Sequence, residues 1–120
     1  MANRVLIVDD HERFRALARR ALEQDGWTVV GEAADGAGAL DVAGRVDADV
    51  VLLDIGLPDV SGIEVAATLR DRAPDVAVVL VSTHDGDDYA QLATGAGARG
   101  FLPKGDLSGA ALGALLAPSR

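Results

Sequence analysis

The chain has 120 residues, enough for one domain with one hydrophobic core, and its 49% apolar and 25% charged residues are ordinary for a soluble protein. Its net charge of −8 argues against binding nucleic acid, and the lack of cysteine excludes disulfides, zinc–thiolate sites and thiol nucleophiles. No apolar stretch approaches the roughly 18 residues that span a bilayer, and the N-terminus is not that of a signal peptide. We expect a cytoplasmic protein that does not enter a membrane.

Short apolar runs alternate with helical patterns along the first half of the chain. Residues 5–8, 27–30 and 50–53 read as strands. Apolar residues recur at helical spacing between the first two strands, and Gly26 should end that helix. This helical face consists of Phe14, Leu17, Ala18, Ala21 and Leu22. Residues 36–46 predict a weaker helix, because each glycine within a helix costs roughly 1 kcal/mol relative to alanine.

The second half repeats the pattern. Ser61 and Glu64 have the spacing of a capping box, so a third helix is expected to start there, before Pro74. Residues 76–81 read as a fourth strand, and Phe101 and Leu102 lie in a short fifth one. A helix between these two strands is indicated by Asp85, Asp87 and Asp88 at its N-terminus and by Tyr89, Leu92, Ala93 and Ala96 on its inner face. A last helix, capped by Asp106, would carry Leu107, Ala111, Leu112 and Leu115.

These elements form a (βα) unit repeated five times, which predicts an α/β fold. Strands that are apolar throughout are typical of a parallel sheet covered by helices on both faces. Ligands of such open sheets bind outside the carboxyl ends of the strands. The polar residues that follow each strand are therefore the candidates for a functional site.

Acidic residues follow the first and third strands. Asp9 and Asp10 close the first strand, and Asp54 closes the third. If these strands are parallel neighbours, three carboxylates meet at one edge, where they repel each other and need a cation. Oxygen donors of this kind suit Mg²⁺. The alternatives are a helix cap plus an exposed acid for the pair, and a turn residue for Asp54.

Hydroxyls and a lysine follow the other two strands. Ser82 and Thr83 end the fourth strand, and Lys104 follows the fifth. Taken singly, Ser82 would cap the next helix and Lys104 would be a solvated surface lysine. Taken together with the acids, they fit phosphoryl transfer to a carboxylate, because a cation, an ammonium and a hydroxyl stabilise the charge on the transferring oxygens.

These residues resemble the receiver domain of bacterial two-component response regulators, over essentially the whole chain. The motifs that carry the resemblance are residues 6–11 (LIVDDH), 51–62 (VLLDIGLPDVSG) and 97–104 (GARGFLPK). The first and last look most like the NarL/FixJ (LuxR-like) subfamily. The resemblance implies a flavodoxin-like, doubly wound (βα)5 sandwich whose five parallel strands are ordered 2-1-3-4-5.

The resemblance also implies roles for individual residues. Asp54 would accept a phosphoryl group from a sensor histidine kinase, with Lys104 and Ser82 assisting. Ser82 and Phe101 would then move as the conformational switch. The Mg²⁺ ligands would be Asp10 and Asp54 directly, Asp9 through water and Gly56 through its backbone carbonyl. His84 would tune the lifetime of the phosphoryl group, or would simply be an exposed loop histidine.

On this reading the chain is a signalling switch and not a turnover enzyme. We expect one receiver domain over residues 1–120 with no output domain, and homodimerisation on phosphorylation. Transcription would be regulated through a partner or a missing C-terminal helix-turn-helix domain, with no direct contact between this segment and nucleic acid.

The sequence argues against three alternatives. A phosphatase of the haloacid dehalogenase type needs a second aspartate at the position of Gly56. A flavodoxin-like FMN binder needs a hydroxyl-rich loop where this chain has Asp9, Asp10, His11 and Glu12, which would repel a phosphate without a metal. A degenerate receiver that works without phosphate is disfavoured, because all the expected positions are filled.

Overall fold

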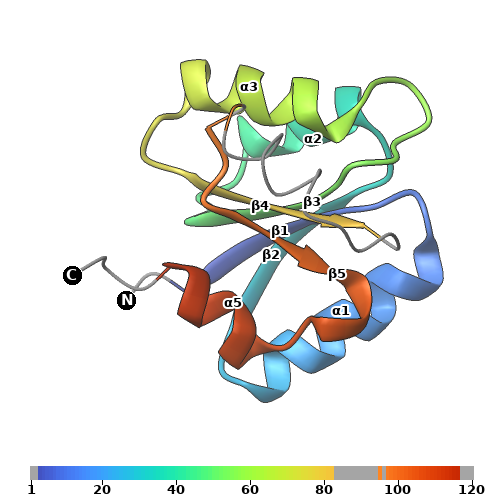
Figure 1. Cartoon of the computed structure of the whole chain (residues 1–120), viewed down its shortest axis with the longest axis vertical. Helices are drawn as coiled ribbons and strands as arrows, with labels where there is room; N and C mark the ends of the chain where they lie inside the picture. The colour runs from blue at the N-terminus through green and yellow to red at the C-terminus, as the bar shows by residue number, and fades with distance from the viewer. Residues whose placement is uncertain (1–2, 83–94, 96, 117–120) are drawn as a thin grey trace.

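The computed structural model describes residues 3–82, 95 and 97–116, and its centre is a five-stranded parallel sheet. The strands are β1 (Arg4–Val8), β2 (Thr28–Ala33), β3 (Val50–Asp54), β4 (Ala77–Ser82) and β5 (Gly100–Pro103). They lie in the order β2-β1-β3-β4-β5, and every neighbouring pair is parallel (Figure 1). The expected α/β class, parallel sheet and strand order are confirmed.

Helices cover both faces of this sheet. They are α1 (Glu12–Gln24), α2 (Gly36–Ala43), α3 (Gly62–Arg72) and α5 (Gly109–Leu116), with a short 3₁₀ turn, η1 (Lys104–Asp106), after β5. Figure 1 shows α2 and α3 on one face and α1 and α5 on the other. The helix expected beyond Asp85, together with Thr83 and His84, lies outside the described residues. Within the described ranges, no helix has the length and apolar character to cross a membrane.

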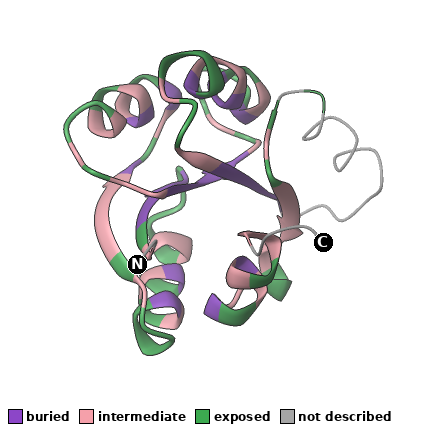
Figure 2. Cartoon of the chain, turned by 90° about the vertical axis from the view of Figure 1, so that its left-hand side faces the viewer, coloured by how far each residue is buried: buried purple, intermediate pink, exposed green. Residues whose placement is uncertain are grey.

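The alternation of side chains along the strands builds two hydrophobic cores. In β1, Leu6 and Val8 pack in the cluster with α2 and α3, whereas Val5 and Ile7 pack in the cluster with α1 and α5. Successive strand residues point to opposite faces, so a strand covered on both faces must be apolar at every position. Figure 2 shows the buried residues gathered on the central strands and on the inner sides of the helices. With few aromatic residues in the chain, these cores consist almost entirely of Val, Leu, Ile and Ala.

Most differences from the sequence expectations concern where elements begin and end. The second strand starts one residue later than expected, at Thr28, and runs on to Ala33. The second helix stops at Ala43, before Gly44. The helix at Ser61 starts as expected, but the Ser61 hydroxyl accepts from the N–H of Ile63 (3.1 Å) and not in the capping-box pattern.

The expected cap of the last helix is wrong. Asp106 belongs to η1, which turns the chain before α5 begins at Gly109. The hydroxyl of Ser108 accepts from the N–H of Ala111 (2.9 Å), and Asp25, from the turn after α1, accepts from the N–H of Gly109 (2.8 Å). Ser108, directly before α5, was a usable local signal for this cap, whereas the contact from Asp25 comes from a distant part of the chain and leaves no local pattern.

The N-terminus of α2 is also capped from a distant loop. Asp35 is its N-cap and accepts from the N–H of Gly38 (2.6 Å). The carboxylate of Asp59, in the loop after β3, accepts from the N–H groups of Gly36 (2.8 Å) and Ala37 (3.0 Å). These backbone donors lower the pKa of Asp59, first through Gly36 and then through Ala37. The loop after Asp54 is therefore linked to helix α2 through the Asp59 carboxylate.

Replacing Asp59 with alanine should lower the stability of the fold at neutral pH. Since its pKa is lower in the folded chain than the ordinary value of 3.8, the ionised carboxylate stabilises the fold above that pH, and this stabilisation is lost as the pH falls through the folded pKa. Thermal unfolding of Asp59→Ala should thus differ from wild type at pH 7 and converge with it in acid. Asp47→Ala, which also removes an exposed acid, is the control; an equal effect of both would contradict the capping role.

Candidate functional site

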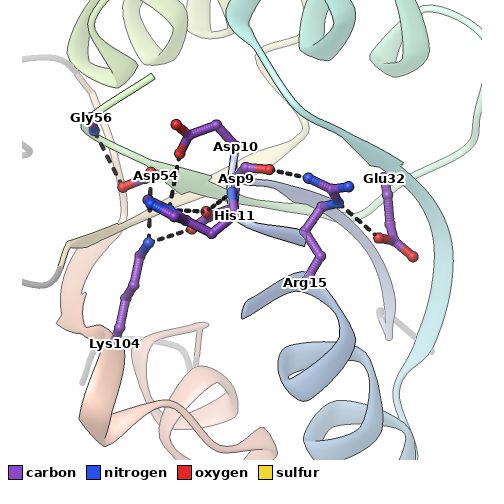
Figure 3. Close-up of polar contacts among 8 residues, drawn as sticks. All are labelled: Asp9, Asp10, His11, Arg15, Glu32, Asp54, Gly56 and Lys104. Carbon is purple, nitrogen blue, oxygen red and sulfur yellow. Dashed lines mark hydrogen bonds and ion pairs between the residues drawn. The ribbon is translucent and has the colours of Figure 1, made fainter. Parts of the chain in front are cut away.

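Three aspartates meet at the carboxyl edge of the sheet, as the sequence predicted for parallel neighbours. β1 and β3 pair directly, with Val8 opposite Leu53, so Asp9, Asp10 and Asp54 emerge side by side (Figure 3). One ligand atom from each of Asp9, Asp10, His11 and Asp54 can be chosen so that all lie within 4.8 Å of one another. The parallel pairing of two separate strand ends therefore creates a compact acidic cluster.

The acids of this cluster differ in burial. Asp9 is completely buried and Asp54 is 5% exposed, whereas Asp10 lies at the surface. Burial raises the pKa of Asp54, and the charge of Asp9 raises it further. Lys104 and the N–H of Gly56, which donates to Asp54 at 3.2 Å, act in the opposite direction without cancelling the rise. Ionised Asp54 therefore sits in a site that favours additional positive charge.

Lys104 brings a positive charge to the acidic cluster. Its Nζ lies 2.6 Å from Asp9 Oδ2 and 3.6 Å from Asp54 Oδ2. Figure 3 marks both contacts with dashed lines. The side chain is only 10% exposed, and Nζ lies 4.6 Å from the ring centroid of Phe14 on α1. The reading of Lys104 as a solvated surface lysine is therefore wrong: η1 turns it inward directly after β5.

The two carboxylate oxygens of Asp9 have different surroundings. Oδ1 accepts from the backbone N–H of His11 (2.8 Å) and lies 3.1 Å from the His11 ring. Oδ2 has the ion pair with Lys104 but no donor aligned for a hydrogen bond. The helix-cap alternative also fails, because the N-cap residue of α1 is His11 and not Asp9 or Asp10, and the His11 side chain makes no capping hydrogen bond. Beyond its ion pair with Lys104, the buried Oδ2 could still accept a hydrogen bond from a metal-bound water.

The donor set of the cluster fits a hard cation. Carboxylate oxygens from three residues, one of them exposed, match the oxygen ligands and retained waters of Mg²⁺, and they also suit Ca²⁺. His11 was not expected here, although its position directly after the acidic pair was a usable signal. Its Nδ1 lies 3.1 Å from carboxylate oxygens of both Asp9 and Asp10.

Ser82 and Phe101 lie on the strands next to this cluster. Ser82 ends β4 and is buried, one residue beyond Val81, the partner of Asp54 across the sheet. Phe101 lies in β5 opposite Leu80 and packs, half-buried, against the core under α2 and α3. Ser82 thus lies next to the acidic edge, whereas Phe101 lies two residues before the carboxyl end of β5; their movement stays a prediction.

A second layer of charged residues behind Asp9 was missed from the sequence. Arg15 Nη1 donates to the backbone carbonyl of Asp9 (2.6 Å), and Arg15 Nε donates to Glu32 (3.0 Å). Figure 3 shows these contacts linking the acidic cluster to Glu32 on β2. An arginine on a helix and a glutamate on a strand carry no local pattern that joins them.

The sequence matches a known protein family and several curated proteins. The family model described as the response regulator receiver domain matches residues 5–110. The nitrate/nitrite response regulator protein NarP of Escherichia coli is 40% identical over 101 residues, which are 83% of this chain and 47% of NarP. The chain spans about half the length of the curated relatives it matches, several of which are named as transcriptional regulators.

Solved structures that resemble this chain are response regulator proteins too. The signal receiver domain assigned to the response regulator NarL of Mycobacterium tuberculosis is 39% identical with a TM-score of 0.84, covering 96% of this chain and 97% of that one. A response regulator protein from Burkholderia pseudomallei is 28% identical with a TM-score of 0.84, covering 96% of this chain and 66% of that one. That structure contains a phosphorylated aspartic acid, a calcium ion and citrate.

The backbone that carries Asp54 is held by a close contact with Gly62. The N–H of Gly62 donates to the carbonyl of Ile55 (2.8 Å), and a Cβ at Gly62 would clash with the carbonyl of Asp54. Gly62→Ala should therefore lower the free energy of unfolding by about 1–3 kcal/mol, as overpacking does. Gly56→Ala is the matched control, because a Cβ there meets nothing within 4 Å. Chemical denaturation measures both, and equal stabilities would refute the packing argument.

Replacing Asp54 with asparagine should stabilise the fold at neutral pH without metal. The raised pKa means that the folded chain binds more protons, so the free energy of unfolding falls as the pH rises from the ordinary value of 3.8 through the folded pKa. Asparagine removes that loss. In EDTA, Asp54→Asn should unfold at a higher temperature than wild type at pH 7, and the difference should vanish below pH 3.8. A less stable variant at pH 7 would contradict it.

Proposed function

Because the chain belongs to the response regulator receiver domain family, of the NarL/FixJ type, we propose that it takes a phosphoryl group from a histidine kinase onto Asp54 and switches conformation in response. The observation that carries this proposal is the cluster at the carboxyl edge: three carboxylates with Lys104 between the two buried ones. A nucleophile, a cation site and a fixed positive charge are together in one place.

The reaction we propose is in-line transfer between two nucleophiles. An oxygen of ionised Asp54 attacks the phosphorus of phosphohistidine, the P–N bond breaks, and the histidine nitrogen leaves with the electron pair and takes up a proton from solvent. The product is an acyl phosphate on Asp54. The Lys104 ammonium, 3.6 Å from Asp54, stabilises the charge on the outer oxygens of the transferring group.

The metal half of the proposed site consists of the acids around Asp54. Asp10 and Asp54 would hold Mg²⁺ directly, Asp9 would hold it through a water, and Gly56 would contribute its carbonyl. Bound Mg²⁺ supplies positive charge that offsets the repulsion among the carboxylates and the incoming phosphoryl oxygens. The phosphorylated aspartic acid and calcium ion in the Burkholderia pseudomallei protein support this assignment.

The switch that we propose couples the new phosphoryl group to β4 and β5. Ser82 would turn its hydroxyl toward the phosphoryl on Asp54, and Phe101 would move into the space that Ser82 leaves. The position of Ser82 next to the strand of Asp54, and of Phe101 two residues from Ser82's partner Pro103, supports this route. Phosphorylation then biases a two-state equilibrium through one local charge.

The partners follow from the same reaction. A kinase must reach the carboxyl edge, and an apolar groove of about 430 Å³ lined by His11, Phe14, Leu17 and Lys104 adjoins it. Leu17 is 58% exposed there, which supports a protein contact. Homodimerisation on phosphorylation and control of transcription through an output domain remain part of the proposal, as does a cytoplasmic location. We also propose that residues 1–120 form one receiver unit that acts as a switch.

The alternative functions are weaker. A haloacid dehalogenase-type phosphatase lacks its second aspartate, because Gly56 stands there without a side chain to act as acid or base. An FMN phosphate would meet three carboxylates at the carboxyl edge of β1 and β3. A receiver that works without phosphate would not need Lys104 buried beside both acids.

Intact mass after incubation with acetyl phosphate or phosphoramidate tests the proposal. In the presence of Mg²⁺ the wild-type chain should gain one phosphoryl group, and Asp54→Ala should gain none. EDTA should abolish the adduct on the wild type. Lys104→Ala should form the adduct at least roughly tenfold more slowly, because it loses the positive charge at the transferring group.

Two results would overturn the assignment. An adduct that survives Asp54→Ala would place the phosphoryl group elsewhere. Steady turnover of a small phosphate ester, without accumulation of an adduct, would favour a phosphatase over a switch.

A further inference from the structure

Both backbone polar groups of Asp9 are tied to the edge strand β2. The N–H of Asp9 donates to the carbonyl of Ala33 (3.0 Å). The carbonyl of Asp9 accepts from Arg15 Nη1 (2.6 Å), and Arg15 Nε donates to Glu32 Oε1 (3.0 Å). Glu32 and Ala33 are the last two residues of β2, so one strand end holds Asp9 both directly and indirectly. Figure 3 shows the indirect route, through Arg15 and Glu32.

The arginine is needed because the sheet ladder stops there. Val8 opposite Ala33 is the last pair between β1 and β2, so the carbonyl of Asp9 lies beyond the ladder. A buried carbonyl without a donor is costly, and a charge-assisted hydrogen bond from a guanidinium is stronger than the strand bond that it replaces. Arg15 thus continues the ladder for one more residue, at the point where the acidic pair begins.

Glu32 holds Arg15 in place and shares itself with a second arginine. Its Oε1 accepts from Arg15, and its Oε2 accepts from Arg19 (2.9 Å). Arg15 is 17% exposed and Arg19 is 39% exposed, so solvent screens the Arg15 pair less. Of these two arginines, Arg15 is the one that reaches the backbone of Asp9.

We propose that Arg15, oriented by Glu32, is a positioning residue for the cation site: it fixes the peptide between Asp9 and Asp10 so that their carboxylates face Asp54. This inference rests on the proposed function, because it assumes that the cluster binds Mg²⁺. Mg²⁺ demands near-ideal octahedral geometry, so its affinity depends on how firmly the ligands are held. Removing the groups that orient metal ligands typically costs about 10–100-fold in affinity.

Electrostatics predicts the opposite sign, which makes the inference testable. Arg15 is a positive charge beside a cation site, so its loss would by charge alone strengthen Mg²⁺ binding. Weaker binding in Arg15→Gln can then come only from lost positioning. Arg19→Gln is the matched control, since it removes the same charge and the same kind of contact with Glu32 without touching Asp9.

Mg²⁺ titration of the whole chain by isothermal calorimetry distinguishes these effects. Arg15→Gln should bind Mg²⁺ at least roughly tenfold more weakly than wild type, and Arg19→Gln should bind it as tightly or slightly more tightly. Glu32→Gln should also weaken binding, in a direction that the loss of its negative charge alone would share. The double variant Arg15→Gln/Glu32→Gln should be no weaker than Arg15→Gln alone, because Glu32 acts through Arg15.

Circular dichroism confirms folding of each variant. If Arg15→Gln fails to fold, Arg15→Lys carries the test: it keeps the positive charge but lacks the planar fork that contacts Asp9 and Glu32, so it should still weaken Mg²⁺ binding. Equal Mg²⁺ affinities of Arg15→Gln and Arg19→Gln, with a wild type that binds Mg²⁺, would overturn the positioning role and leave the proposed function standing. A wild type that takes up no Mg²⁺ would overturn the cation site and this inference together.

Discussion

The mutual repulsion of buried carboxylates is the constraint on which the site depends. Asp9 and Asp54 lie inside the protein at the end of adjacent strands, where ionised groups lose hydration and repel each other. Lys104, 2.6 Å from Asp9, offsets part of that cost, and the raised pKa of Asp54 shows that the offset is incomplete. The remaining negative charge supports the proposal that the site binds a cation.

The fold supplies the rigidity that this electrostatic conflict requires. Carboxylates that repel each other would move apart on flexible loops. Asp54, however, ends a central strand, and its backbone carbonyl packs against Gly62. The following loop is joined to α2 by Asp59, and Asp9 is held to β2 through Ala33 and Arg15. Residues outside the acidic cluster thus keep the acids together, at the expense of stability in the metal-free protein.

The sequence interpretation succeeded where several ambiguous residues had to converge. Asp9, Asp54 and Lys104 each had an ordinary explanation, as a helix cap, a turn residue and a surface lysine. The parallel pairing of β1 with β3 and the inward turn of η1 bring them within ion-pair distance, which those explanations do not account for. Errors arose where a single residue was interpreted locally, as with Asp106, because η1 displaces the start of α5 by less than one helical turn.

The sequence by itself determined the strands, most of the described helices and the aspartates and lysine of the candidate site, because apolar periodicity and residues at strand ends are local signals. Tertiary structure decided the remaining contacts. These are the bonds of Arg15 with Asp9 and Glu32, of Asp59 with the N-terminus of α2, and of Asp25 with the N-terminus of α5. Each of these joins residues on different elements through a single charged side chain. No period or spacing records such a contact, because it exists only once the sheet and helices have packed.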